Sequence, residues 1–197
     1  MFYELPFNFI KPPIEHVLVI QTASDNLSPA QAQSNVENRA KQVINAIKLR
    51  QMSRLASFVH PTKGLRFSPY SYIDPQTDSL FTAAQLKNLH SSRRRYIWGT
   101  FDGSGEQIRL TFANYYKRFI YDRDYINAPV ISYNKIAKQG NSTNNLSEIY
   151  PKSVFVEYHF PGSKKYSGLD WRSLRLVFEN KAGAWFLVGI VHDQWTI

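Results

Sequence analysis

The chain has 197 residues, with 24 Lys and Arg against 15 Asp and Glu, so that its formal net charge is +9, and it contains no cysteine. The length suits one domain that can bury roughly 70% of its unfolded surface, and an aromatic content of 15% favours a packed, β-rich core over disorder. The lack of cysteine excludes disulfides, thiolate metal ligands and a cysteine nucleophile.

The N-terminal part of the chain is predicted to contain an arm followed by a long helix. Residues 1–27 are apolar, broken by proline and without a regular period, and we expect them to form the arm. Ser28-Pro29 is typical of a helix start, because serine caps and proline fits the first helical position. One helix, or two in series with a bend near residue 50, then ends at His60-Pro61. Its buried stripe is predicted to contain Val36, Ala40, Val43, Ile44 and Ile47.

The central part of the chain is predicted to mix short strands with short helices. Asp102-Gly-Ser-Gly105 has the composition of a turn between two strands, while Thr82 and Thr111 are candidate helix caps. The segment 138–151 is polar and rich in asparagine, so we expect a loop there. The patterns predict strands at 65–72, 96–101, 107–110 and 129–136, and helices at 82–89 and 112–121.

The C-terminal part of the chain is predicted to be a run of antiparallel strands. A strand at 153–160 precedes two apolar, β-favouring runs that flank Asn180-Lys-Ala-Gly183, which is a strong hairpin signal. Trp195 follows the last run, and we expect it to be buried in the core. Helices first and strands last predict an α+β domain over residues 28–197, with the long helix packed on a curved antiparallel sheet.

Ionisable residues that interrupt the apolar strands are the candidates for a pocket. Glu157 and His159 share one face of their strand, so they could form an acid–base pair or a structural hydrogen bond. Arg175 lies between two leucines and needs a partner, which is either Glu157 in a structural ion pair or an anionic group of a ligand. His192 on the last strand completes the candidate pocket, whereas its neighbour Asp193 should point to the opposite face.

Metal, cofactor and membrane signals are weak. The five histidines, at positions 16, 60, 90, 159 and 192, show no metal-ligand spacing, and Asp102-Gly-Ser-Gly105 lacks the lysine of a phosphate loop. We therefore expect no metal and no cofactor. No apolar run approaches the roughly 18 residues of a membrane span, so none is expected. Met1 to Pro13 does not have the pattern of a signal peptide.

Four motifs carry a resemblance to a known family. Residues 98–105 (WGTFDGSG), 155–162 (FVEYHFPG), 169–178 (LDWRSLRLVF) and 187–197 (LVGIVHDQWTI) resemble an uncharacterised bacterial family whose members are often secreted or lipid-anchored. The resemblance covers roughly residues 40–197 and implies a location in the cell envelope or outside the cell, but no activity. More distantly, the order of helix and hairpin resembles the cystatin-like or nuclear-transport-factor-2-like (NTF2-like) cone, in which a curved sheet leaves a pocket at its open end.

These observations favour a non-catalytic domain that binds a small molecule or a protein. A small-molecule enzyme that uses Glu157 and His159 as acid and base is the first alternative. The second is a basic surface that binds nucleic acid or another anionic polymer. Nucleic acid is the less favoured partner, because the one dense basic cluster, Arg93-Arg94-Arg95, leads directly into a predicted strand. The sequence is also compatible with a homodimer.

Overall fold

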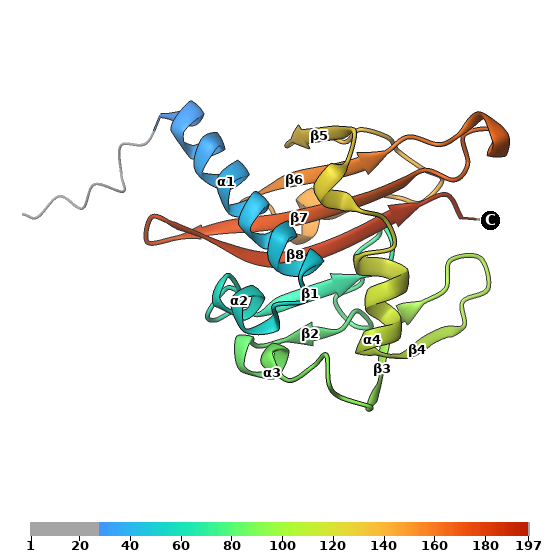
Figure 1. Cartoon of the computed structure of the whole chain (residues 1–197), viewed down its shortest axis with the longest axis horizontal. Helices are drawn as coiled ribbons and strands as arrows, with labels where there is room; N and C mark the ends of the chain where they lie inside the picture. The colour runs from blue at the N-terminus through green and yellow to red at the C-terminus, as the bar shows by residue number, and fades with distance from the viewer. Residues whose placement is uncertain (1–27, 197) are drawn as a thin grey trace, which may run out of the picture.

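The structure is a computed structural model that describes residues 28–196. The predicted arm at residues 1–27 lies outside the described residues. A six-stranded sheet, a separate two-stranded sheet and several helices make up the domain (Figure 1). The predicted α+β class is therefore confirmed.

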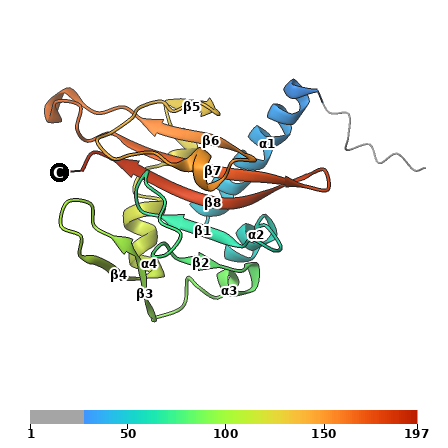
Figure 2. The same ribbon diagram turned by 180° about the vertical axis from the view of Figure 1, so that it is seen from behind.

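The main sheet consists of strands from both halves of the chain. Its members are β1 (Leu65–Ser68), β2 (Leu80–Phe81), β5 (Val130–Tyr133), β6 (Ser153–Phe160), β7 (Arg172–Lys181) and β8 (Ala184–Gln194). Their order is β2-β1-β8-β7-β6-β5, and every neighbouring pair is antiparallel except β1 and β8, which are parallel. The last strand of the chain therefore lies inside the sheet, between the first strand and β7 (Figures 1 and 2).

Two helices precede the sheet. Helix α1 (Pro29–Lys48) begins at a capping box, in which Ser28 and Gln31 each accept a backbone N–H of the other. The chain then turns at Arg50, whose φ is 53°, and continues as α2 (Met52–Ser57). The buried stripe of α1 packs against β6 and β8 and joins one continuous hydrophobic core. The helix thus covers one face of the sheet (Figure 1).

The remaining elements are short and connect or cover the main sheet. They are α3 (Ala83–Lys87), β3 (Arg95–Thr100), β4 (Gln107–Thr111), α4 (Phe112–Tyr115), the π-helical turn η1 (Tyr116–Ile120), η2 (Tyr125–Asn127), α5 (Leu146–Ile149) and η3 (Lys164–Tyr166). Strands β3 and β4 pair with each other and form the second sheet. No helix among residues 28–196 is long and apolar enough to cross a bilayer.

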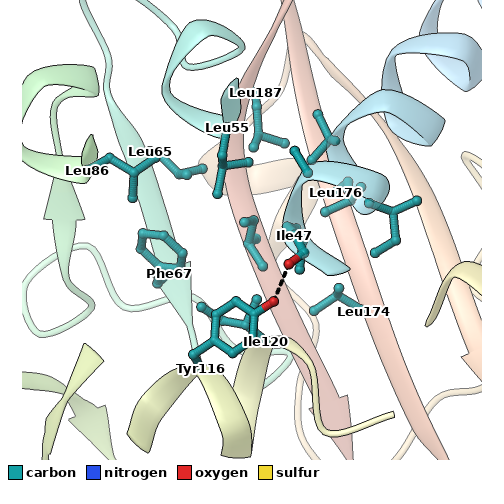
Figure 3. Close-up of a cluster of buried hydrophobic side chains, with 14 of the residues drawn as sticks. Ile47, Leu55, Leu65, Phe67, Leu86, Tyr116, Ile120, Leu174, Leu176 and Leu187 are labelled. Carbon is teal, nitrogen blue, oxygen red and sulfur yellow. Dashed lines mark hydrogen bonds between the residues drawn. The ribbon is translucent and has the colours of Figure 1, made fainter. Parts of the chain in front are cut away.

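The main hydrophobic core lies between α1, α2, α4 and the face of the sheet that they cover. Ile47, Leu55, Phe67 and Leu176 meet there (Figure 3), and the hydroxyl of Tyr116 donates a hydrogen bond to the Ile47 carbonyl at the end of α1. This bond satisfies a carbonyl that the end of a helix leaves without an intrahelical partner. The hydrogen bond joins η1 to the end of α1 and so helps to fix the position of η1.

The C-terminal hairpin is present, but its end differs from the prediction. Strands β7 and β8 pair along their length and turn at Ala182 and Gly183, which both have positive φ. The prediction that Trp195 is buried is wrong, because its side chain is 39% exposed. Strand β8 ends at Gln194, so Trp195 extends beyond the sheet, and the Thr196 side chain anchors the end by hydrogen bonds to Asp102 and Asn141 instead.

Candidate functional site

Three of the charged residues on the sheet form a buried network on the face opposite α1. Arg175 is fully buried; its Nε lies 3.3 Å from Oε2 of Glu157, the residue directly across on β6, and its Nη2 lies 2.7 Å from Oδ2 of Asp193 on β8. The ion pair predicted between Glu157 and Arg175 is therefore present. Asp193 is a second partner, since one guanidinium has enough donors to hold two carboxylates.

The network is further tied to the segment that covers it. Oε2 of Glu157 also accepts a hydrogen bond from the backbone N–H of Ala137 at 3.2 Å. Burial raises the pKa of Asp193, and the neighbouring guanidinium of Arg175 acts in the opposite direction. One atom of each residue, Oε1 of Glu157, Nη1 of Arg175 and Oδ1 of Asp193, has no partner among residues 28–196. Buried atoms of this kind are commonly bridged by internal water.

His159 lies on the same face as this network and is paired with a serine. Its Nδ1 is 2.8 Å from Oγ of Ser173, the residue opposite it on β7. Burial lowers the pKa of His159, and Glu157 nearby acts in the opposite direction. A serine beside an imidazole is the geometry of an activated nucleophile, but Ser173 is completely buried. The linings of the two clefts described below include none of Glu157, His159 and Arg175.

His192 lies on the other face of the sheet, apart from the other three candidates. Its Nδ1 is 3.1 Å from the carbonyl oxygen of Pro69, its Nε2 is 3.4 Å from Oδ2 of Asp122, and its ring meets the edge of Phe119. Adjacent residues of a strand point in opposite directions, so His192 and Asp193 are divided between the two faces. The structure thus brings together Glu157, His159 and Arg175, and places His192 elsewhere.

Two open clefts lie near the end of β8, and they differ in the charge of the side chains that line them. The first, called the acidic cleft below, encloses about 410 Å³. It includes three carboxylates, two tyrosines and several neutral polar groups, and no lysine or arginine. Its lining is Pro69, Tyr70, Tyr72, Asp74, Thr77, Asp78, Thr100, Asp102, Asn141, Ser142 and Thr143.

The three carboxylates of the acidic cleft differ in their proton affinity. Burial raises the pKa of Asp78 to about 7, although the Ser68 hydroxyl donates to its Oδ2 at 2.5 Å. Hydrogen bonds from the hydroxyls of Ser142 and Thr196 lower the pKa of Asp102. The backbone N–H of Gln76 and other donors lower the pKa of Asp74. At neutral pH two of these groups are ionised and the third is partly protonated.

The segment 141–143 forms one wall of the acidic cleft, and its position depends on the preceding residue, Gly140. A Cβ built on Gly140 would lie 2.9 Å from the buried ring of Trp171, which is closer than real Cβ atoms come. The next residue, Asn141, exchanges hydrogen bonds with the backbone of Thr196, from Nδ2 to the carbonyl at 2.6 Å and from the N–H to Oδ1 at 3.3 Å. Gly140 therefore lets this wall approach the end of β8.

The second cleft, called the basic cleft below, encloses about 470 Å³ and has the opposite charge. Lys117 and Arg118 come from η1, Arg123 from the loop that follows, and Arg172 from the start of β7. The other lining residues are Asp122 and Gln194. Phe101 lies between two acidic-cleft residues in the sequence, Thr100 and Asp102, and the guanidinium of Arg118 lies over its ring, 4.6 Å from the centroid.

Sequence reasoning singled out none of the clefts' charged residues as site candidates. Asp78 and Asp122 lie in segments without a motif. Asp102 belongs to the 98–105 motif, but its segment was interpreted as a turn that lacks the lysine of a phosphate loop. Arg172 lies in the 169–178 motif, and the resemblance assigns it no role. The clefts are assembled from segments that are far apart in the chain, and no spacing rule connects such segments.

Comparison with known proteins adds no relative: no family model matches the sequence, and a search of curated proteins finds no match. No group of three or more His, Asp or Glu side chains suited to a metal ion occurs in the part of the chain that the structure describes.

Proposed function

We propose that this protein is a non-catalytic ligand-binding domain whose acidic cleft holds a small organic cation. The observation that carries the proposal is the composition of the cleft, which combines three carboxylates with no basic side chain in a protein of net charge +9. A cavity lined by one sign of charge raises the local concentration of ligands of the opposite sign. An amine or a quaternary ammonium group fits this description.

The tyrosines supply the second part of the argument. Tyr72 is 55% exposed at the cleft, and Tyr70 is buried in its wall. An aromatic face attracts a cation through the ring quadrupole, and carboxylates beside the ring add hydrogen bonds to an ammonium N–H. The hydroxyl oxygens of Thr77 and Ser142 would complete the polar contacts of a protonated amine by accepting hydrogen bonds.

The geometry does not favour the alternative in which Glu157 and His159 act as acid and base. The Glu157 carboxylate is committed to the Arg175 guanidinium and to a backbone N–H, and both side chains are buried. A general base must lie within hydrogen-bond reach of a proton on the substrate, which an open site provides and this buried face does not. The network instead supports the sheet from which the clefts are built.

The proposal extends to the fold and to the family. A long helix across a mostly antiparallel sheet, with the first strand parallel to the last, supports an NTF2-like cone as the finer description of the domain. The bacterial family that shares the four motifs is the proposed family of this chain, and the cell envelope or the exterior is its proposed location. A binding domain that faces the environment would be consistent with an open cleft for a small cation.

Titration calorimetry with spermidine and with choline tests the function. We expect spermidine to bind, and we expect Asp102→Asn and Tyr72→Ala each to weaken its binding by about fivefold or more, which corresponds to about 1 kcal/mol. The matched control is Asp170→Asn, which removes one carboxylate outside both clefts and should change the affinity less than twofold.

The outcomes separate the ligand class from a general charge effect. Equal losses in Asp102→Asn and Asp170→Asn would overturn the proposal, as would dissociation constants weaker than about 1 mM for both probes. Tyr72→Ala provides an independent variant, because an exposed tyrosine can be removed without loss of the fold.

A further inference from the structure

We propose that the basic cleft is a separate site for a small multivalent oxyanion of the phosphate type. Four cationic side chains line it, and the only carboxylate in its lining is Asp122. The site differs in position and in charge from the acidic cleft, so it does not rest on the function proposed above.

The single carboxylate in the cleft is already neutralised by other groups. Oδ2 of Asp122 accepts a hydrogen bond from Nε of Arg172 at 3.2 Å and lies 3.4 Å from Nε2 of His192, and Oδ1 accepts one from the Tyr125 hydroxyl at 2.8 Å. These donors use both oxygens of the carboxylate. Asp122 therefore acts as a support for Arg172 and not as a competitor for the other cations.

Two arginines are held in place while some of their donors stay free. Arg172 uses Nε for Asp122 and Nη1 for the Trp171 carbonyl at 2.8 Å, so its Nη2 keeps its hydrogen atoms for a ligand. The guanidinium of Arg118 stacks on Phe101 at 4.6 Å and on Phe119 at 5.3 Å. Stacking fixes the plane of a guanidinium but leaves its edge donors available, which is the arrangement that suits a planar or tetrahedral oxyanion.

The remaining cations are not consumed by internal ion pairs. Among residues 28–196, Lys117, Arg118 and Arg123 form no salt bridge with any carboxylate. Three cations without an ion-pair partner around one concave space favour an anion that carries more than one charge. A phosphate or a phosphate ester meets this need with several acceptor oxygens.

Calorimetric titration with inorganic pyrophosphate tests the site in the full chain. We expect Arg118→Gln and Arg123→Gln each to weaken pyrophosphate binding by fivefold to tenfold, about 1–1.4 kcal/mol. The matched control is Arg54→Gln on α2, which removes the same charge outside both clefts and should change the affinity less than twofold. Arg118→Lys should recover only part of the loss, because an ammonium neither stacks in the same way nor offers a planar fork.

A second arm of the experiment separates a local site from general attraction to polyanions. A single-stranded oligonucleotide should bind weakly and lose affinity at moderate salt, with similar effects of Arg118→Gln and Arg54→Gln. The proposal is overturned if pyrophosphate fails to bind, or if Arg54→Gln weakens it as much as Arg118→Gln does. Circular dichroism of each variant verifies the fold, and Arg123→Gln, at an exposed position, keeps the test decisive if Arg118→Gln unfolds.

Discussion

Arg172 and Arg175 lie three residues apart on one strand, yet they belong to opposite regions of the molecule. Arg175 is fully buried between Glu157 and Asp193, on the face away from α1. Arg172 faces the basic cleft, where its side chain is 24% exposed and one of its terminal nitrogens stays free. A spacing of three places two side chains on opposite faces of a strand. The same residue type is therefore structural on one face and available to a ligand on the other.

The comparison shows what a charge inside an apolar strand indicates. Charged residues between leucines stand out in a sequence because they have to be buried, and burial requires partners. Charged residues that are exposed in a cleft need no such partners and follow no pattern. The ionisable residues of β6 and β7, which stand out because they interrupt apolar runs, thus form the buried ion-pair network of the sheet. The charged residues of η1 and the loops, which interrupt no such pattern, line the clefts.

The largest expected effect separates the two arginines directly. Arg175→Met leaves two buried carboxylates without their partner, so we expect the free energy of unfolding to fall by about 3–5 kcal/mol. Arg172→Met removes a half-buried pair whose carboxylate keeps the Tyr125 hydroxyl as a donor, and we expect a loss of about 1 kcal/mol. Urea denaturation measures both values. Equal losses would show that the two faces are not as different as their burial indicates.

The second prediction concerns Asp78, which is buried but borders the acidic cleft. Its native pKa of about 7 exceeds its ordinary value of 3.8, so between these values the folded protein holds a proton that the unfolded chain releases. Stability should therefore fall as pH rises from about 4 to 7, by about 2–4 kcal/mol for this group. Asp78→Asn should remove that fall. Thermal or urea unfolding of both proteins at pH 5 and pH 8 tests this, and parallel pH profiles would contradict it.

The third prediction concerns Gly140, which precedes the wall of the acidic cleft formed by residues 141–143. Gly140→Ala forces a Cβ against Trp171, so we expect a loss of about 1–3 kcal/mol from overpacking. Because the same wall carries Asn141 and Ser142, spermidine binding should weaken as well, while pyrophosphate binding at the basic cleft should not. Gly105→Ala is the control, because its Cβ would meet nothing within 4 Å. Its positive φ should make that control mildly destabilising without affecting the cleft.

The smallest expected effect is at the end of the chain. Trp195→Ala should lower the free energy of unfolding by less than about 1 kcal/mol, because the side chain is 39% exposed. The contrast is Trp171→Ala, which empties a fully buried site and should lower it by about 3–5 kcal/mol. Melting temperatures of the two variants decide the matter. A large loss of stability in Trp195→Ala would instead support the sequence-based prediction that Trp195 is buried in the core.

The parts of the structure that sequence could predict are those that rest on local periodicity. The α+β class, the hairpin around Ala182 and Gly183, and the ion pair between Glu157 and Arg175 follow from alternation along strands and from the need to pair a buried charge. The exposure of Trp195 could not be predicted, because it depends on where β8 leaves the sheet.

The clefts could not be predicted for a different reason. The acidic cleft combines residues near 70–78, 100–102 and 141–143, and the basic cleft combines η1 with the start of β7. Such combinations depend on the packing of loops against the sheet, which has no period. The division of His192 and Asp193 between two faces was predictable, but which face served which site was not.

The parallel pairing of β1 with β8 has a consequence for how the protein reaches its native state. The pairs Arg66–Gly189 and Ser68–Val191 join two segments that lie far apart in the sequence, near the two ends of the domain. Such contacts require closure of a very long loop before they return any stabilising energy, so they slow folding. During synthesis β1 has to wait, with one edge unpaired, until β8 leaves the ribosome and inserts beside it. Completion of the sheet, and with it of both clefts, is therefore expected to be a late event in folding.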